Sequence, residues 1–104
     1  MTTQHLKQLA IRYKLALAQK SIPVRAIYLF GSFAKGNARK GSDIDLCVIS
    51  SIFGKDDFKE MVLINQVAKR VAPEIEAFPV PENEFIKKNN PFIIEALKTG
   101  ERLA

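Results

Sequence analysis

The segment GSFAKGNARKGSDIDLCVIS, residues 31–50, decides how the chain folds, because a glycine-rich connection leads into a strand that begins with two acids. Asp43 and Asp45 alternate with apolar residues over 44–48, the pattern of a strand with one face in the core. Both carboxylates should therefore emerge on one face, about 6 to 7 Å apart at their Cα atoms. A register slip of one residue would drive both acids into the core. The alternation therefore predicts that the strand holds both carboxylates in fixed positions.

The same segment carries groups suited to a cation and an anion. Mg²⁺ takes oxygen ligands and often binds through one or two carboxylates plus substrate phosphates, and two metal ions about 3.5 to 4 Å apart could share such a pair. Gly31 and Ser32 can turn free backbone N–H groups and a hydroxyl toward an anion. Lys35, Arg39 and Lys40 could add positive charge nearby. Each part alone is more often an ordinary turn or strand start, but the combination predicts a metal and phosphate site.

Helices and strands alternate around this segment. Apolar residues at helical spacing, with threonines available as an N-cap, predict a first helix from Thr3 to about Lys20. Acids early and bases late favour a second long helix, because this order suits the helix dipole. Short apolar runs bounded by turn residues predict strands. The predicted strands are 26–30, 43–50 and 74–80, and the predicted helices are 3–20, 32–36, 55–72, 81–89 and 90–100.

This order of elements predicts an α/β (α+β) fold, a small mixed sheet of three to four strands with helices packed on it. We expect a single domain over residues 1–104, because a chain of this length usually carries one core. Pro79 indicates that the third strand is an edge strand or ends there. Whether the first two strands pair in parallel stays open at this point, since their connection has at most a turn of helix.

Composition limits the class of protein. The formal net charge is +5, but the basic residues are scattered, which favours a solvated surface over a nucleic-acid interface. No apolar run approaches the roughly 18 residues that span a membrane, and the N-terminal sequence does not look like a signal peptide. We therefore expect a cytoplasmic protein that binds no membrane. The only cysteine, Cys47, should be buried, His5 should lie on the surface, and the seven phenylalanines should belong to the core and to helix contacts.

Residues 31–46 resemble the signature of the DNA polymerase β-type nucleotidyltransferase superfamily, Gly-Ser followed by a spacer and Asp-x-Asp, and more narrowly its minimal nucleotidyltransferase (MNT) branch. A looser likeness covers nearly the whole chain, including IEAFPVPENEF and the closing LKTGERL. The positions that match the branch are Gly31, Ser32, Ala34, Gly36, Ser42, Asp43, Asp45 and Leu46.

The resemblance implies a polymerase β-type nucleotidyltransferase fold that binds one or two Mg²⁺ ions and ATP or another NTP. Asp43 and Asp45 would be catalytic residues and metal ligands. The family uses a third carboxylate on a later strand, and here Glu76 in PEIEAFPV aligns best, while Glu74 remains possible because it points to the same face. The expected nucleotide-binding residues are Gly31, Ser32, Lys35, Arg39 and Ser42.

The third carboxylate separates the functions that the resemblance allows. Glu76 is a glutamate where the superfamily often has an aspartate, and the extra methylene changes its reach. The first expectation is an enzyme that transfers a nucleoside monophosphate, AMP from ATP, to a hydroxyl of a partner, as the antitoxin of a HEPN-domain toxin. The second is an antitoxin that neutralises its toxin by binding, with weak or no turnover. The third is a small-molecule transferase of the aminoglycoside type.

Overall fold

A computed structural model gives the fold of residues 2–31, 41–87, 91, 93, 94, 98 and 100–104. The described elements are α1 (Thr3–Gln19), β1 (Ala26–Phe30), β2 (Ile44–Ser50), α3 (Asp57–Val71), β3 (Ile75–Pro81), α4 (Glu82–Lys87) and β4 (Glu101–Arg102). Three predicted strands and the two long helices are thereby confirmed, each to within about three residues. The helix predicted at 32–36 lies outside the described residues, as does part of the helix predicted at 90–100.

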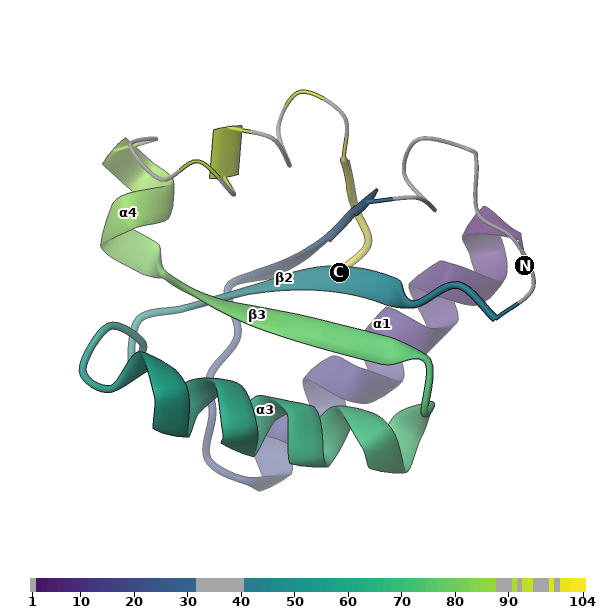
Figure 1. Cartoon of the computed structure of the whole chain (residues 1–104), viewed down its shortest axis with the longest axis horizontal. Coiled ribbons are helices and arrows are strands. Elements are labelled where there is room, and N and C mark those ends of the chain that lie inside the picture. The colour runs from purple at the N-terminus through teal and green to yellow at the C-terminus, as the bar shows by residue number, and fades with distance from the viewer. Residues whose placement is uncertain (1, 32–40, 88–90, 92, 95–97, 99) are drawn as a thin grey trace.

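The strands form one mixed sheet in the order β3-β2-β1-β4 (Figure 1). β1 and β2 are antiparallel, with Phe30 opposite Asp45, which settles the pairing that the sequence left open. β2 and β3 are parallel, with Asp45 opposite Glu76. β4, which the sequence did not predict as a separate strand, pairs antiparallel with β1 over two residues. The end of β1 and the starts of β2 and β3 consequently meet at one side of the sheet.

The two long helices cover one face of this sheet and contact each other (Figure 1). Thr2 caps α1 by accepting a hydrogen bond from His5 N–H, and Asp56 caps α3 in the same way for Lys59. Beneath the helices lies the larger core. It contains Leu9, Tyr13 and Leu17 of α1, Ile64, Val67 and Ala68 of α3, and Ile27, Leu29, Ile44, Leu46, Val48, Ile75 and Ala77 of the sheet.

The opposite face carries a smaller apolar cluster. Its buried members are Ala26, Phe30, Cys47, Ile49, Val80 and Ile93, with Tyr28, Phe78 and Phe85 packed against them. Cys47 is buried as predicted, and burial raises the pKa of its thiol to about 12. Both faces of the sheet are therefore partly covered, so nearly the whole of β2 is buried.

One sequence expectation on α3 needs correction. Phe58 was expected in the core or at a helix contact, but its side chain is 77% exposed. The buried stripe of α3 runs through Ile64, Val67 and Ala68, and Phe58 lies on a different side of the helix. β3 is an edge strand, as Pro79 indicated, and it continues through Pro79 to Pro81, because an edge strand needs no N–H donor on its outer side. No helix in the described parts of the chain is long and apolar enough to cross a membrane.

Candidate active site

Three carboxylates gather at the side of the sheet where β2 and β3 begin. Asp43 directly precedes β2, Asp45 is its second residue, and Glu76 is the second residue of β3. The parallel register sets Glu76 beside Asp45. The side chains of Asp43 and Glu76 also lie close enough to influence each other's charge. The structure thus brings together the two aspartates that the motif predicted and the glutamate that the alignment with IEAFPV favoured.

Gly31 closes this group from the end of β1. Its φ is +74°, in the left-handed region that favours glycine. A Cβ built on Gly31 would lie 2.2 Å from Oδ2 of Asp45, so only a glycine allows the backbone to come this close to the carboxylate. The position that the motif assigns to phosphate binding therefore lies directly against the predicted metal ligand.

The carboxylates influence one another's charge. The pKa of Asp45 is raised, mainly because the side chain is partly desolvated and also because of the charge of Asp43. The pKa of Glu76 is raised by desolvation, then by the charges of Asp45 and Asp43, while Lys69 lowers it. The site thus holds more negative charge than it readily accommodates, and a cation would relieve the repulsion.

Two α3 side chains hold the strand on both sides of Glu76. Asn65 donates through Nδ2 to the carbonyl of Ala77 at 2.9 Å and accepts through Oδ1 from the N–H of Ala77 at 2.9 Å. Lys69 donates to the carbonyls of Pro73, at 3.0 Å, and Ile75. Glu76 lies between these bonded residues, so α3 sets its position relative to β2. The sequence analysis missed Asn65 and Lys69, although their i, i+4 spacing in NQVAK was a usable signal.

Two further predicted site residues, Glu74 and Ser42, lie in the described part of the chain. Glu74 lies just before β3, where its backbone carbonyl accepts from Ile44 N–H at 2.8 Å. Ser42 is partly exposed and directly precedes Asp43. The remaining predicted nucleotide-binding residues, Ser32, Lys35 and Arg39, lie outside the described residues.

The donor set suits a hard divalent cation, since carboxylate oxygens are the ligands that Mg²⁺ prefers. Within the described ranges, no group of three or more His, Cys, Asp or Glu residues is arranged to hold a metal ion. Asp43 and Asp45 nevertheless offer two carboxylates, one directly before β2 and one on its second residue. They fit an ion whose remaining ligands come from water and nucleotide phosphates, which is how Mg²⁺ is commonly held in phosphoryl-transfer sites.

Comparison with known proteins agrees with this geometry. A family model described as a nucleotidyltransferase domain matches residues 11–100. The match includes the ends of β1, β2 and β3 that carry the candidate site. No curated protein sequence matches the chain.

Solved structures with the same fold include an inferred nucleotidyltransferase from Sulfolobus solfataricus, with 22% identity and a TM-score of 0.58 over 82% of this chain and 75% of that one. A toxin-antitoxin complex with AMP-PNP has 20% identity and a TM-score of 0.62 over 94% of this chain and 72% of that one. A mutant of the toxin-antitoxin MntA-HpeT has 16% identity and a TM-score of 0.58 over 100% of this chain and 73% of that one. At these identities the likeness shows a common fold.

Proposed function

The chain belongs to the nucleotidyltransferase domain family, and on that premise we propose that it transfers AMP from ATP to a hydroxyl group of a partner protein. One observation carries the proposal: Asp43, Asp45 and Glu76 gather at one side of the sheet, and Asp45 lies against Gly31 at the end of β1. This arrangement offers cation ligands beside a backbone that an anion can approach.

In the proposed reaction the acceptor oxygen attacks the α-phosphorus, the bond from that phosphorus to the β-phosphate oxygen breaks, and pyrophosphate leaves. Asp43 and Asp45 would hold Mg²⁺, which when bound neutralises phosphate charge. Gly31 leaves room for phosphate oxygens next to Asp45. Glu76, which lies beside Asp45 in the parallel register, would accept the hydroxyl proton.

The proposed partner is a HEPN-domain toxin, with this chain as the antitoxin. Support comes from the fold shared with two toxin-antitoxin structures, one of which contains AMP-PNP.

The direct test is Mg²⁺-dependent transfer of label from α-labelled ATP to the co-expressed toxin, followed by a mass increase of one AMP on the toxin. Asp43→Asn combined with Asp45→Asn should abolish labelling, whereas labelling that persists unchanged would refute the assignment. Glu76→Gln and Glu74→Gln form a matched pair, and only the first should slow transfer if Glu76 accepts the proton.

A second candidate is an antitoxin that acts by binding alone. The observation in its favour is that the described residues contain no three-ligand group for a metal ion. In that case the Asp43→Asn, Asp45→Asn variant would still neutralise the toxin in cells, and no AMP adduct would form. Transfer activity and neutralisation measured on the same variants distinguish the two candidates.

A further inference from the structure

The outer edge of β3 changes character along its length. In the parallel pairing with β2, Ile44 N–H bonds to Glu74 O, so alternate residues from Ile75 to Pro81 turn their backbone groups away from β2. On this outer side, Lys69 of α3 bonds to the carbonyl of Ile75, and Asn65 of α3 bonds to both the carbonyl and the N–H of Ala77. The next two outward residues are prolines, which have no N–H. The first half of the edge is therefore covered by α3, and the second half cannot pair with another strand in the usual way.

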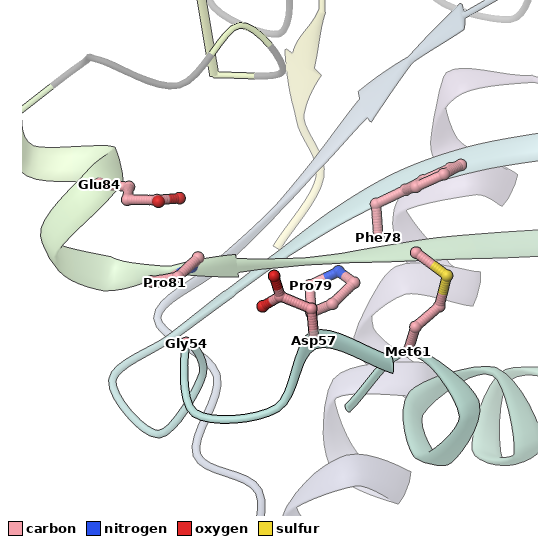
Figure 2. Close-up of a pocket in the computed structure, with 7 residues that line it drawn as sticks. All are labelled: Gly54, Asp57, Met61, Phe78, Pro79, Pro81 and Glu84. Atoms are coloured by element: carbon pink, nitrogen blue, oxygen red, sulfur yellow. The ribbon is translucent and has the colours of Figure 1, made fainter. Parts of the chain in front are cut away.

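A pocket of about 290 Å³ opens beside this second half (Figure 2). Asp57 and Met61, which line it, continue the i, i+4 row of Asn65 and Lys69 along α3. The complete lining is Gly54, Asp57, Met61, Phe78, Pro79, Pro81 and Glu84. Its volume is at the lower end of the roughly 300 to 1,000 Å³ of ordinary ligand sites, so it suits one side chain better than a nucleotide.

The chemistry of the lining favours a cation with an apolar stem. Its side chains supply two carboxylates, Asp57 from α3 and Glu84 from α4, and otherwise only apolar groups (Figure 2). The N–H of Gly54 is already bonded to Glu60 Oε1 at 2.9 Å. A ligand would thus meet hydrogen-bond acceptors above an apolar floor, which matches a guanidinium on its aliphatic chain.

Asp57 differs from the nearby acids Asp56, Glu60 and Glu82, whose carboxylates already have hydrogen-bond or ion-pair partners. Asp56 caps α3, Glu60 accepts from three backbone N–H groups, and Glu82 pairs with Arg25 at 2.6 Å. Within the described parts of the chain, the carboxylate of Asp57 has no hydrogen bond or ion pair. Such a carboxylate beside an apolar pocket is complementary to a positive group from outside.

Two exposed apolar residues follow pocket residues in the sequence of α3. Phe58, next to Asp57, is 77% exposed and Val62, next to Met61, is 41% exposed, and the two are one turn apart. Exposed large apolar side chains beside a pocket are typical of surfaces that contact another protein.

We propose that this pocket is a docking site for an arginine side chain of a partner protein, with apolar residues on either side of the arginine packing on Phe58 and Val62. The guanidinium would lie between Asp57 and Glu84, and its stem would pack on Met61 and Phe78. Pro79 is three residues beyond Glu76, about 10 Å along the strand, so docking here leaves the candidate active site open. The proposal does not depend on nucleotidyl transfer.

The test is an NMR titration of the full ¹⁵N-labelled chain with acetyl-Leu-Arg-Leu-amide, using acetyl-Leu-citrulline-Leu-amide as the uncharged isostere. The arginine peptide should shift the amides of Gly54, Asp57, Met61 and Glu84 saturably, and the citrulline peptide should bind at least fivefold more weakly. Equal shifts with both peptides, or shifts scattered over the surface, would overturn the proposal.

Two variants and a control sharpen the result. Asp57→Asn should weaken the arginine peptide at least fivefold, whereas Glu101→Gln, the same charge change on exposed β4, should not. Met61→Lys places a cation in the pocket and should also abolish binding. The spectra themselves report whether each variant is folded. Spermidine that binds as tightly as the arginine peptide would show a general cation site and contradict the partner proposed here.

Discussion

The two faces of the sheet are built from alternate residues of the same strands, yet one face forms the larger core and the other carries the candidate site. On one face, Ile27, Leu46 and Ile75 are fully or almost fully buried under α1 and α3. On the other face, the strands change along their length from carboxylates at Asp45 and Glu76 to an apolar cluster beyond them. Burial of one face fixes the register of each strand. The opposite face can therefore carry unfavourable charge where the strands begin.

The aromatic residues mark the boundary on the second face. Phe30 lies opposite Asp45, and its ring meets that of Phe78 edge to face at 5.4 Å. This pair lies next to the carboxylates on the same face of the sheet, so the charged part of that face borders directly on its apolar part.

The largest effect should follow Asp45→Asn. If Asp45 holds the metal, transfer should fall by about 10²- to 10³-fold, the range for loss of one key electrostatic group. The free energy of unfolding at pH 7 should stay the same or rise, because the raised pKa shows that the ionised carboxylate is unfavourable in the folded state. Transfer assays and urea unfolding on the same preparation measure both, and a less stable variant would contradict the reasoning.

Ile64→Ala, on the helix-covered face, should lower stability and leave transfer nearly unchanged. Ile64 is completely buried in the core between α3 and the sheet. Truncating it should lower the free energy of unfolding by about 3 kcal/mol, from lost burial and the cavity left behind. Transfer per folded molecule should change little. A large loss of activity at temperatures where the variant is folded would show that the two faces are not separable.

Gly31→Ala probes the contact between β1 and the site. The added Cβ would meet Oδ2 of Asp45 at 2.2 Å, so the carboxylate must move, and the left-handed backbone at Gly31 costs about 1 to 2 kcal/mol for a residue with a side chain. Gly41→Ala is the matched control, since Gly41 also has a positive φ, of 85°, but open space around its Cβ position. Gly31→Ala should lose at least as much stability as Gly41→Ala, because the carboxylate must also move, and only Gly31→Ala should lose transfer activity.

The smallest effect is expected for Tyr13→Phe. The Tyr13 hydroxyl donates to the carbonyl of Ile64 at 2.6 Å within the core, and its loss should cost about 1 kcal/mol at pH 7. Unfolding at several pH values by circular dichroism measures this difference.

The pH dependence adds a second readout. Burial raises the pKa of Tyr13 and raises that of Cys47 to about 12, so the unfolded chain loses these protons at lower pH than the folded chain does. The free energy of unfolding should therefore fall as pH rises above about 9. In Tyr13→Phe this fall should be shallower, with the part due to Cys47 remaining. An unchanged alkaline slope would contradict the assignment.

Much of the fold could be predicted from local patterns. The alternation in DIDLCV predicted which residues of β2 enter the larger core, and the structure confirms Ile44, Leu46 and Val48 there. Helical spacing placed α1 and α3 to within a few residues. The exposure of Phe58 could not be predicted, because periodicity alone does not say which of two apolar stripes of a helix meets the sheet. β4 escaped prediction because two residues are too few to form a pattern.

Local sequence patterns were enough to place α1, β1, β2, α3 and β3 in order and to put Asp43 and Asp45 on the same side of the chain where β2 begins, since these features depend on neighbours along the chain. The antiparallel pairing of β1 with β2 and the position of Glu76 beside Asp45 came from the tertiary structure. It also decided that a pocket opens where β3 ends in prolines. These features depend on which strands pair once all apolar faces are buried together, and that choice involves residues far apart in the sequence.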